Sequence, residues 1–166
     1  MATDIRLLRS EVDRLSSLVS QLSVRTVRLL ALSAFGRHYA YAEDLAESTN
    51  TSSTFQQKLR LTTPDLKGAG NNRYLLQWSF TYFNTTEEGG DIEVRIEQDD
   101  TTQLWNMVWD HTWEDDSSDS GNRWPAAGAI EVTLPRGVYT FDMDFRNPSS
   151  GTALISQATM TFWRVV

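Results

Sequence analysis

The chain has 166 residues, a formal net charge of −7 at pH 7 and a sequence pI near 4.8. This length allows one domain with its own core and a short appendage, and the acidic balance argues against nucleic acid as a partner. The absence of cysteine excludes disulfides, thiolate catalysis and zinc–thiolate sites. No uninterrupted apolar run approaches the roughly 18 residues of a membrane span, so neither a membrane anchor nor a secretory signal is predicted.

The first predicted element is a helix over residues 3–33 with a coiled-coil seam. Apolar or small residues recur at alternating spacings of three and four for about four heptads. They are Ile5, Leu8, Val12, Leu15, Val19, Leu22, Thr26 and Leu29. We predict that residues 1–34 form an oligomerisation helix. A homotrimer is favoured over a dimer because Leu18, Leu30 and Leu32 widen the seam. The alternative is an amphipathic helix packed on its own domain.

A connecting segment is predicted over residues 35–56. It begins with "RHYAYA" (37–42), a weak strand candidate, and ends in the polar stretch "ESTNTSST" (47–54), which is typical of a linker or a surface arm. After Phe35-Gly36 the period of the apolar residues changes to two, which indicates strands.

Residues 57–166 are predicted to form a mainly β domain, an antiparallel β-sandwich. Turn-forming connections such as "NTTEEGG" and "RNPSSG" separate short segments in which apolar and polar residues alternate. The strongest strand candidates are residues 57–62, 74–83, 91–98, 103–113, 129–134, 138–146 and 153–166.

The stretch "WNMVWDHTW" (105–113) places three tryptophans at every fourth position, on one face of a predicted strand. Large aromatic side chains supply much of the burial in β domains, so we interpret this face as part of the core. A ligand-binding platform is the alternative.

Residues suited to catalysis are scarce. The two histidines, His38 and His111, lie far apart in the sequence, and no nucleophile, zinc-protease or phosphate-binding motif is present. We therefore predict no enzyme activity, no catalytic residues and no cofactor. The stretch "EDDSSDSGN" (114–122) does not match the spacing of a calcium loop, so a solvated acidic loop is favoured over a metal site.

A candidate ligand-binding site is predicted around this acidic loop. Exposed tryptophans beside carboxylates provide the stacking face and the hydrogen bonds that sugars use. Trp124 precedes a proline, which holds it extended. The candidate residues are Trp113, Trp124, Asp115, Asp116 and Asp119. A glycan of a host surface is the partner that this hypothesis implies.

A heptad helix that runs directly into a Tyr/Phe/Trp-rich β domain ending in "SQATMTFWRVV" resembles the trimeric fibre, spike and head-decoration proteins of tailed bacteriophages. It also resembles the trimeric jelly rolls that include C1q-like and tumour-necrosis-factor-like domains, in which "GVYTF" (137–141) matches a penultimate core strand. The resemblance implies a jelly-roll-like fold and a homotrimeric virion structural protein, attached to the capsid or another virion protein. The alternative function is a carbohydrate- or receptor-binding module.

Overall fold

The computed structural model describes residues 14–15, 38–67, 72–85, 90–110 and 123–165. The chain divides into two compact units, residues 1–37 and 38–166. In the first unit only Arg14 and Leu15 are described; both are helical, and Leu15 is 50% exposed. The other seam residues lie outside the described residues, so the coiled coil stays a prediction. They are Ile5, Leu8, Val12, Val19, Leu22, Thr26 and Leu29.

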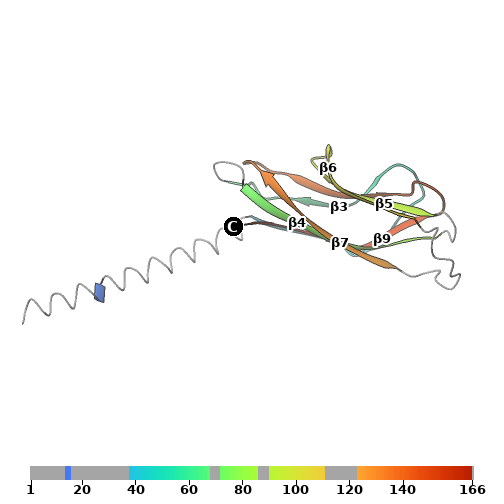
Figure 1. The fold of residues 1–166 in the computed structure, drawn as a ribbon, viewed down its shortest axis with the longest axis horizontal. Helices are drawn as coiled ribbons and strands as arrows, with labels where there is room; N and C mark the ends of the chain where they lie inside the picture. Colours follow the sequence, from blue (N-terminus) through green and yellow to red (C-terminus); the bar gives the residue numbers. More distant parts are fainter. Residues whose placement is uncertain (1–13, 16–37, 68–71, 86–89, 111–122, 166) are drawn as a thin grey trace, which may run out of the picture. The chain divides into compact units, whose positions relative to one another are not determined.

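The second unit is an antiparallel sandwich of two sheets, which form the two layers visible in Figure 1. Its strands are β1 (Tyr39–Asp44), β2 (Ser48–Asn50), β3 (Gln56–Thr62), β4 (Asn72–Asn84), β5 (Asp91–Gln98), β6 (Thr102–Asp110), β7 (Trp124–Leu134), β8 (Thr140–Arg146) and β9 (Ala153–Arg164). One sheet has the order β1-β9-β4-β7, and β2 also pairs with β9. The other sheet has the order β3-β8-β5-β6. The prediction of a mainly β, jelly-roll-like antiparallel fold is confirmed.

The core lies between the sheets and follows the predicted alternation. Every second residue of β4 is buried from Tyr74 to Tyr82, and β8 buries Phe141, Met143 and Phe145. The ring of Phe162 on β9 stacks on Tyr74 with centroids 4.8 Å apart and lies 5.5 Å from Phe141. Each such side chain contributes about 1.5–3 kcal/mol through burial, so these inner faces hold the two layers together.

The sandwich begins earlier than expected, because the second compact unit starts at His38. Most of the segment predicted as a connection over 35–56 therefore belongs to the β domain. Tyr39 pairs with Trp163 and Ser48 with Ile155, so β1 and β2 follow one another along the same edge of β9. The polarity of "ESTNTSST" indicated a linker. β2 is nevertheless a short polar strand at the sheet edge, and Asn50 anchors it by donating hydrogen bonds to the carbonyls of Thr54 and Phe145.

Lys58 links the second sheet to this edge. The β3–β8 register shifts between Gln57 and Leu59, and the side chain of Lys58 is fully buried. Its Nζ donates to Oδ2 of Asp44 at 2.8 Å, the carbonyl of Ala46 at 2.6 Å and Oγ of Ser48 at 3.1 Å. All three ammonium protons have acceptors, as a buried lysine requires. The hydrogen bond from Lys58 lowers the pKa of Asp44.

Candidate functional site

The structure tests little of the predicted ligand site. Trp113, Asp115, Asp116 and Asp119 lie outside the described residues. Trp124 is the first residue of β7, half-buried against the core. Among the described residues, no group of three His, Asp or Glu side chains is placed to hold a metal ion. No helix in the described part of the chain is long and apolar enough to cross a membrane.

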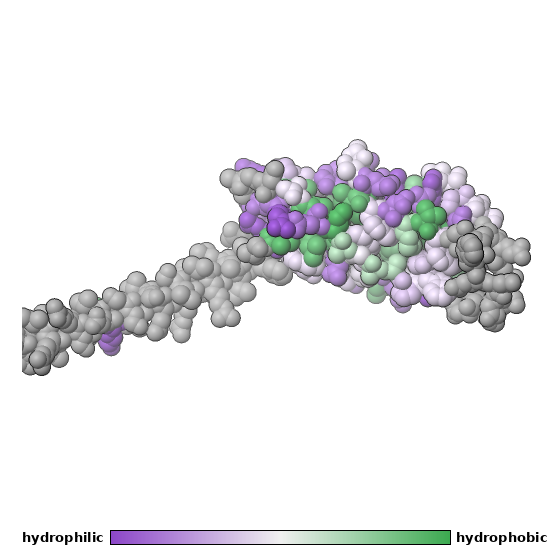
Figure 2. Space-filling model, in the orientation of Figure 1, coloured by the Kyte–Doolittle hydropathy of each residue, from purple (hydrophilic) through white to green (hydrophobic). Residues whose placement is uncertain are grey.

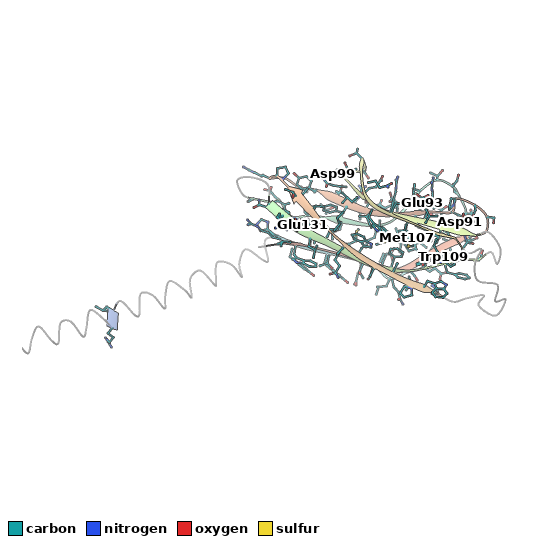
Figure 3. All side chains as sticks on the ribbon, viewed as in Figure 1. Asp91, Glu93, Asp99, Met107, Trp109 and Glu131 are labelled. Carbon is teal, nitrogen blue, oxygen red and sulfur yellow. The ribbon has the colours of Figure 1, made fainter. Side chains whose placement is uncertain are left out.

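The tryptophans of β6 pack against the core. Trp105 lies 5.2 Å from Trp78 and 6.4 Å from Phe80, and Trp109 lies 5.4 Å from Tyr82, between ring centroids. Figure 3 shows Trp109 and Met107 between the two layers. For Trp105 and Trp109 the geometry thus agrees with the core interpretation, whereas the rest of the stretch, from 111 to 113, lies outside the described residues.

One side of the sandwich, between the edge strands β6 and β7, is open. The inward-facing side chains of β6 and of β7 up to Ile130 are only half-buried, whereas those of β4, β8 and β9 are almost fully buried. Figure 2 shows apolar atoms exposed along the side of the sandwich, between more polar atoms of the two layers. The half-buried residues are Trp105, Met107, Trp109, Trp124, Ala126 and Ile130.

The outer face of the β1-β9-β4-β7 sheet is a broad surface without charge. We call it the uncharged face and define it by Tyr39, Tyr41, Leu75, Gln77, Ser79, Thr81, Pro125, Ala127, Ala129, Thr159, Thr161 and Trp163. The strand register places these residues in rows across the sheet, for example Tyr39, Trp163 and Leu75. The described charged side chains of this sheet's outer side lie at the margins of the uncharged face: Glu43, Arg73, Arg123 and Glu131.

The hydroxyls of the uncharged face bond within the sheet. Oγ of Ser79 and Oγ1 of Thr159 lie 2.8 Å apart, and Oγ1 of Thr81 lies 2.8 Å from Oγ of Ser156. Groups that already have partners lose little when water is removed, so another surface can cover them at low cost. Two large side chains add apolar area, because Tyr39 is 42% and Tyr41 50% exposed.

A hollow of about 460 Å³ interrupts this face, lined by Ser79, Phe80, Thr81, Pro125, Ala126, Ala127 and Gln157. It lies beside a β-bulge. The β4–β9 register shifts between Ser79 and Thr81, and Gln157 has a positive φ of 52°. The extra residue bends β9 away from regular pairing. None of the residues that line the hollow is charged, so the hollow is as uncharged as the surface around it.

The outer face of the β3-β8-β5-β6 sheet is the reverse: it is densely charged. We call it the charged face and define it by Arg60, Glu93, Arg95, Glu97, Asp142, Asp144 and Arg146. Its arginines pair with the carboxylates, and the guanidinium carbons of Arg95 and Arg146 lie 3.8 Å and 4.5 Å from the ring centre of Phe55. The two outer faces of one domain therefore differ sharply in charge.

No known family matches the chain, and no curated protein is similar to it in sequence. Solved structures are similar in fold. The Eiger TNF structure from S. frugiperda has a TM-score of 0.50 at 7% identity, covering 77% of this chain and 92% of that one. A crystal structure of dimeric latent PorU from Porphyromonas gingivalis has a TM-score of 0.51 at 10% identity, covering 77% of this chain and 13% of that one. Murine APRIL at pH 8.0 gives a TM-score of 0.44 at 12% identity, covering 77% and 98%.

The likeness to the Eiger TNF structure shows a jelly-roll-like fold and nothing finer. It agrees with the TNF-like part of the predicted resemblance. Neither the Eiger TNF nor the PorU structure is described as a phage protein, so the likeness to phage fibre and decoration proteins stays a prediction from the sequence architecture.

Sequence analysis missed the uncharged face. A signal was present, because the outward positions of residues 75–81 and 159–163 carry no charge, while those of 93–97 and 142–146 are charged throughout. Both sets were interpreted only as the solvent-facing sides of strands. Only the pairing of β4 with β7 and β9 shows that the uncharged positions join into one surface.

Proposed function

We propose that the protein is a non-enzymatic virion structural protein: a homotrimer whose helices associate through the predicted heptad seam and which displays three β domains as a capsid decoration or fibre. The uncharged face carries this proposal. It offers each β domain a surface on which another copy of the chain can pack.

The contrast in charge supports self-association through this face. The chain has 22 acidic and 15 basic residues, and its surface would be expected to mix them everywhere. Instead one outer sheet face is densely charged, and the other exposes tyrosine, alanine and threonine with its charges only at the margins. Depletion of charge and exposure of aromatic side chains mark the centre of protein–protein interfaces. Like-charged acidic domains would also repel one another through any other broad surface.

The predicted coil and the uncharged face would act together. A helix that joins three chains raises the effective concentration of the attached β domains to the millimolar range, so a weak contact between faces becomes sufficient. The sequence resembles trimeric jelly-roll domains, and the fold is similar to that of a tumour necrosis factor structure. This agreement supports the proposed arrangement at the level of the fold.

Attachment to a virion rests on the architecture of a short heptad helix before a compact β domain. Three copies joined at the helix would bind a particle with avidity even where each contact is weak. Immunogold electron microscopy with antibodies against residues 38–166 tests this step. Gold on the surface of purified particles is expected. Protein found only in the particle-free fraction of the lysate would reject the virion assignment and leave self-association to be tested separately.

A further inference from the structure

Four carboxylates of the charged face are buried although they lie on an outer sheet surface. Glu93, Glu97, Asp142 and Asp144 are between 1% and 9% exposed. The guanidinium groups of Arg60, Arg95 and Arg146 cover them. Three guanidinium groups therefore pair with four buried carboxylates, so at least two of the carboxylates have to share one guanidinium group.

Two of the four buried anions each pair with an arginine that no other buried carboxylate shares. Asp142 accepts from Nε and Nη2 of Arg60 at 2.6 Å and 2.9 Å and from Nε2 of Gln57 at 2.7 Å. Glu93 accepts from Nε of Arg146 at 2.6 Å and from Nδ2 of Asn106 at 2.9 Å. Both carboxylates have charge-assisted hydrogen bonds, which are the stronger kind.

Glu97 and Asp144 share one cation. Nη2 of Arg95 lies 2.8 Å from Oε2 of Glu97 and 3.1 Å from Oδ2 of Asp144. This shared guanidinium nitrogen brings the two carboxyl groups close together. In the strand register Glu97 stands directly opposite Asp142, and like charges in such a pair destabilise a sheet. Glu97 thus shares the guanidinium of Arg95 with Asp144 and also lies opposite a third carboxylate, Asp142.

We propose that Glu97 is a proton-operated switch of stability: it takes up a proton, donates it in a hydrogen bond to Asp144, and makes the β domain more stable in mildly acidic solution than at neutral pH. The same proton removes the repulsion between Glu97 and Asp142. Arg95 is then left to pair with Asp144 alone.

The charged groups around Glu97 agree with this assignment. On β8 they are Asp142 and Asp144, on its own strand Arg95, and on β3 Arg60, which reaches it only through Asp142. The paired residue on β6 is Gln103, which is uncharged. Asp100, in the following turn, pairs with Arg60 and adds negative charge. No second cation among these described neighbours compensates Glu97.

The pKa shifts of Glu97 and Asp142 have the direction that the proposal requires. Burial raises the pKa of Glu97, with further increases from Asp144 and Asp142, while Arg95 opposes them. Burial also raises the pKa of Asp142, against the effect of Arg60. A carboxyl whose pKa is higher in the folded than in the unfolded state binds protons more tightly when folded. Stability then rises as the pH falls through the folded-state pKa, and the gain is complete below the unfolded-state pKa.

The test is thermal unfolding of the full chain between about pH 7.5 and 5.5, a range above the ordinary carboxyl pKa values. Tryptophan fluorescence reports on the β domain, because all six tryptophans lie between residues 78 and 163. The wild-type Tm should rise as the pH falls. Glu97→Gln should have a higher Tm than wild type at pH 7.5 and lose the rise. The matched variant Glu93→Gln, which breaks a satisfied pair, should lower the Tm at both pH values.

A wild-type Tm that falls or stays level across this range would overturn the proposal, as would a Glu97→Gln protein less stable than wild type at pH 7.5. If the variant does not fold, the side-chain carboxyl of Glu97 can be titrated by NMR in the wild-type protein. A midpoint at or below that of an ordinary glutamate would also overturn it.

Discussion

Gly128 on β7 lies directly against the indole ring of Trp78 on β4: a Cβ atom added to Gly128 would be 2.5 Å from Cζ2 of Trp78. The two residues are cross-strand partners. Trp78 is 2% exposed and in turn contacts Trp105 on the opposite sheet. Because Gly128 has no side chain, the indole of Trp78 fits against β7 and can contact Trp105 of the opposite sheet.

Gly128→Ala should destabilise the β domain by about 1–3 kcal/mol, because the added methyl group must displace a buried indole. Urea unfolding followed by tryptophan fluorescence measures the change. Thr133→Val, an exposed site on the same strand, is the matched control and should stay within about 0.5 kcal/mol of wild type. A Gly128→Ala protein as stable as the control would show that Trp78 has space to move.

Lys58→Met should cost about 1–3 kcal/mol, since three acceptors lose their buried donor and the partly exposed Asp44 is left without its cation. Urea unfolding at pH 7 gives the difference. Lys67→Met is the control: the Lys67 side chain is 78% exposed and its pair with Asp65 spans 3.8 Å, so almost no change is expected. Equal effects of the two substitutions would contradict a specific role for the Lys58 link.

Thr161→Arg should weaken the homotrimer without unfolding the domain, because it places a charge in the middle of the uncharged face, where a packed neighbour would have to bury it. Sedimentation velocity over a range of concentrations detects the loss. Thr62→Arg makes the same change on an exposed position of β3, in the other sheet, and should leave assembly intact. If both variants assemble like wild type, the uncharged face is not the contact surface.

Leu15→Asp combined with Leu22→Asp should yield monomers, because both positions lie in the predicted heptad seam and would bury unpaired charges there. Arg14→Asp combined with Ser17→Asp adds the same charges at neighbouring positions outside the seam and serves as the control. Size-exclusion chromatography with light scattering separates the outcomes. An oligomer that survives both charges in the seam would exclude the coiled coil.

The sandwich could be predicted because alternation is a local property. In "YLLQWSFTYF" and "VYTFDMDFR" the apolar parity identified the inward residues of β4 and β8, and all of those from Tyr74 to Tyr82 and from Phe141 to Phe145 are buried. The weak candidate "RHYAYA" overlaps β1, which adds one buried alanine, Ala40. Its signal was weak because an edge strand contributes little to the core.

Long-range relationships were not predictable. β7 was expected to begin at residue 129, but it begins at Trp124, and Gly128 in the added part lies against Trp78 of the neighbouring strand. Likewise nothing in the local sequence places Glu97 opposite Asp142. Both pairings depend on sheet order and register, which residues distant in sequence determine together.

The most direct test of the central claim is the solution mass of the intact chain by multi-angle light scattering at near-physiological salt. A homotrimer predicts three times the chain mass of 18.9 kDa. A mass of 18.9 kDa that does not rise with protein concentration would contradict both the coiled coil and the role of the uncharged face.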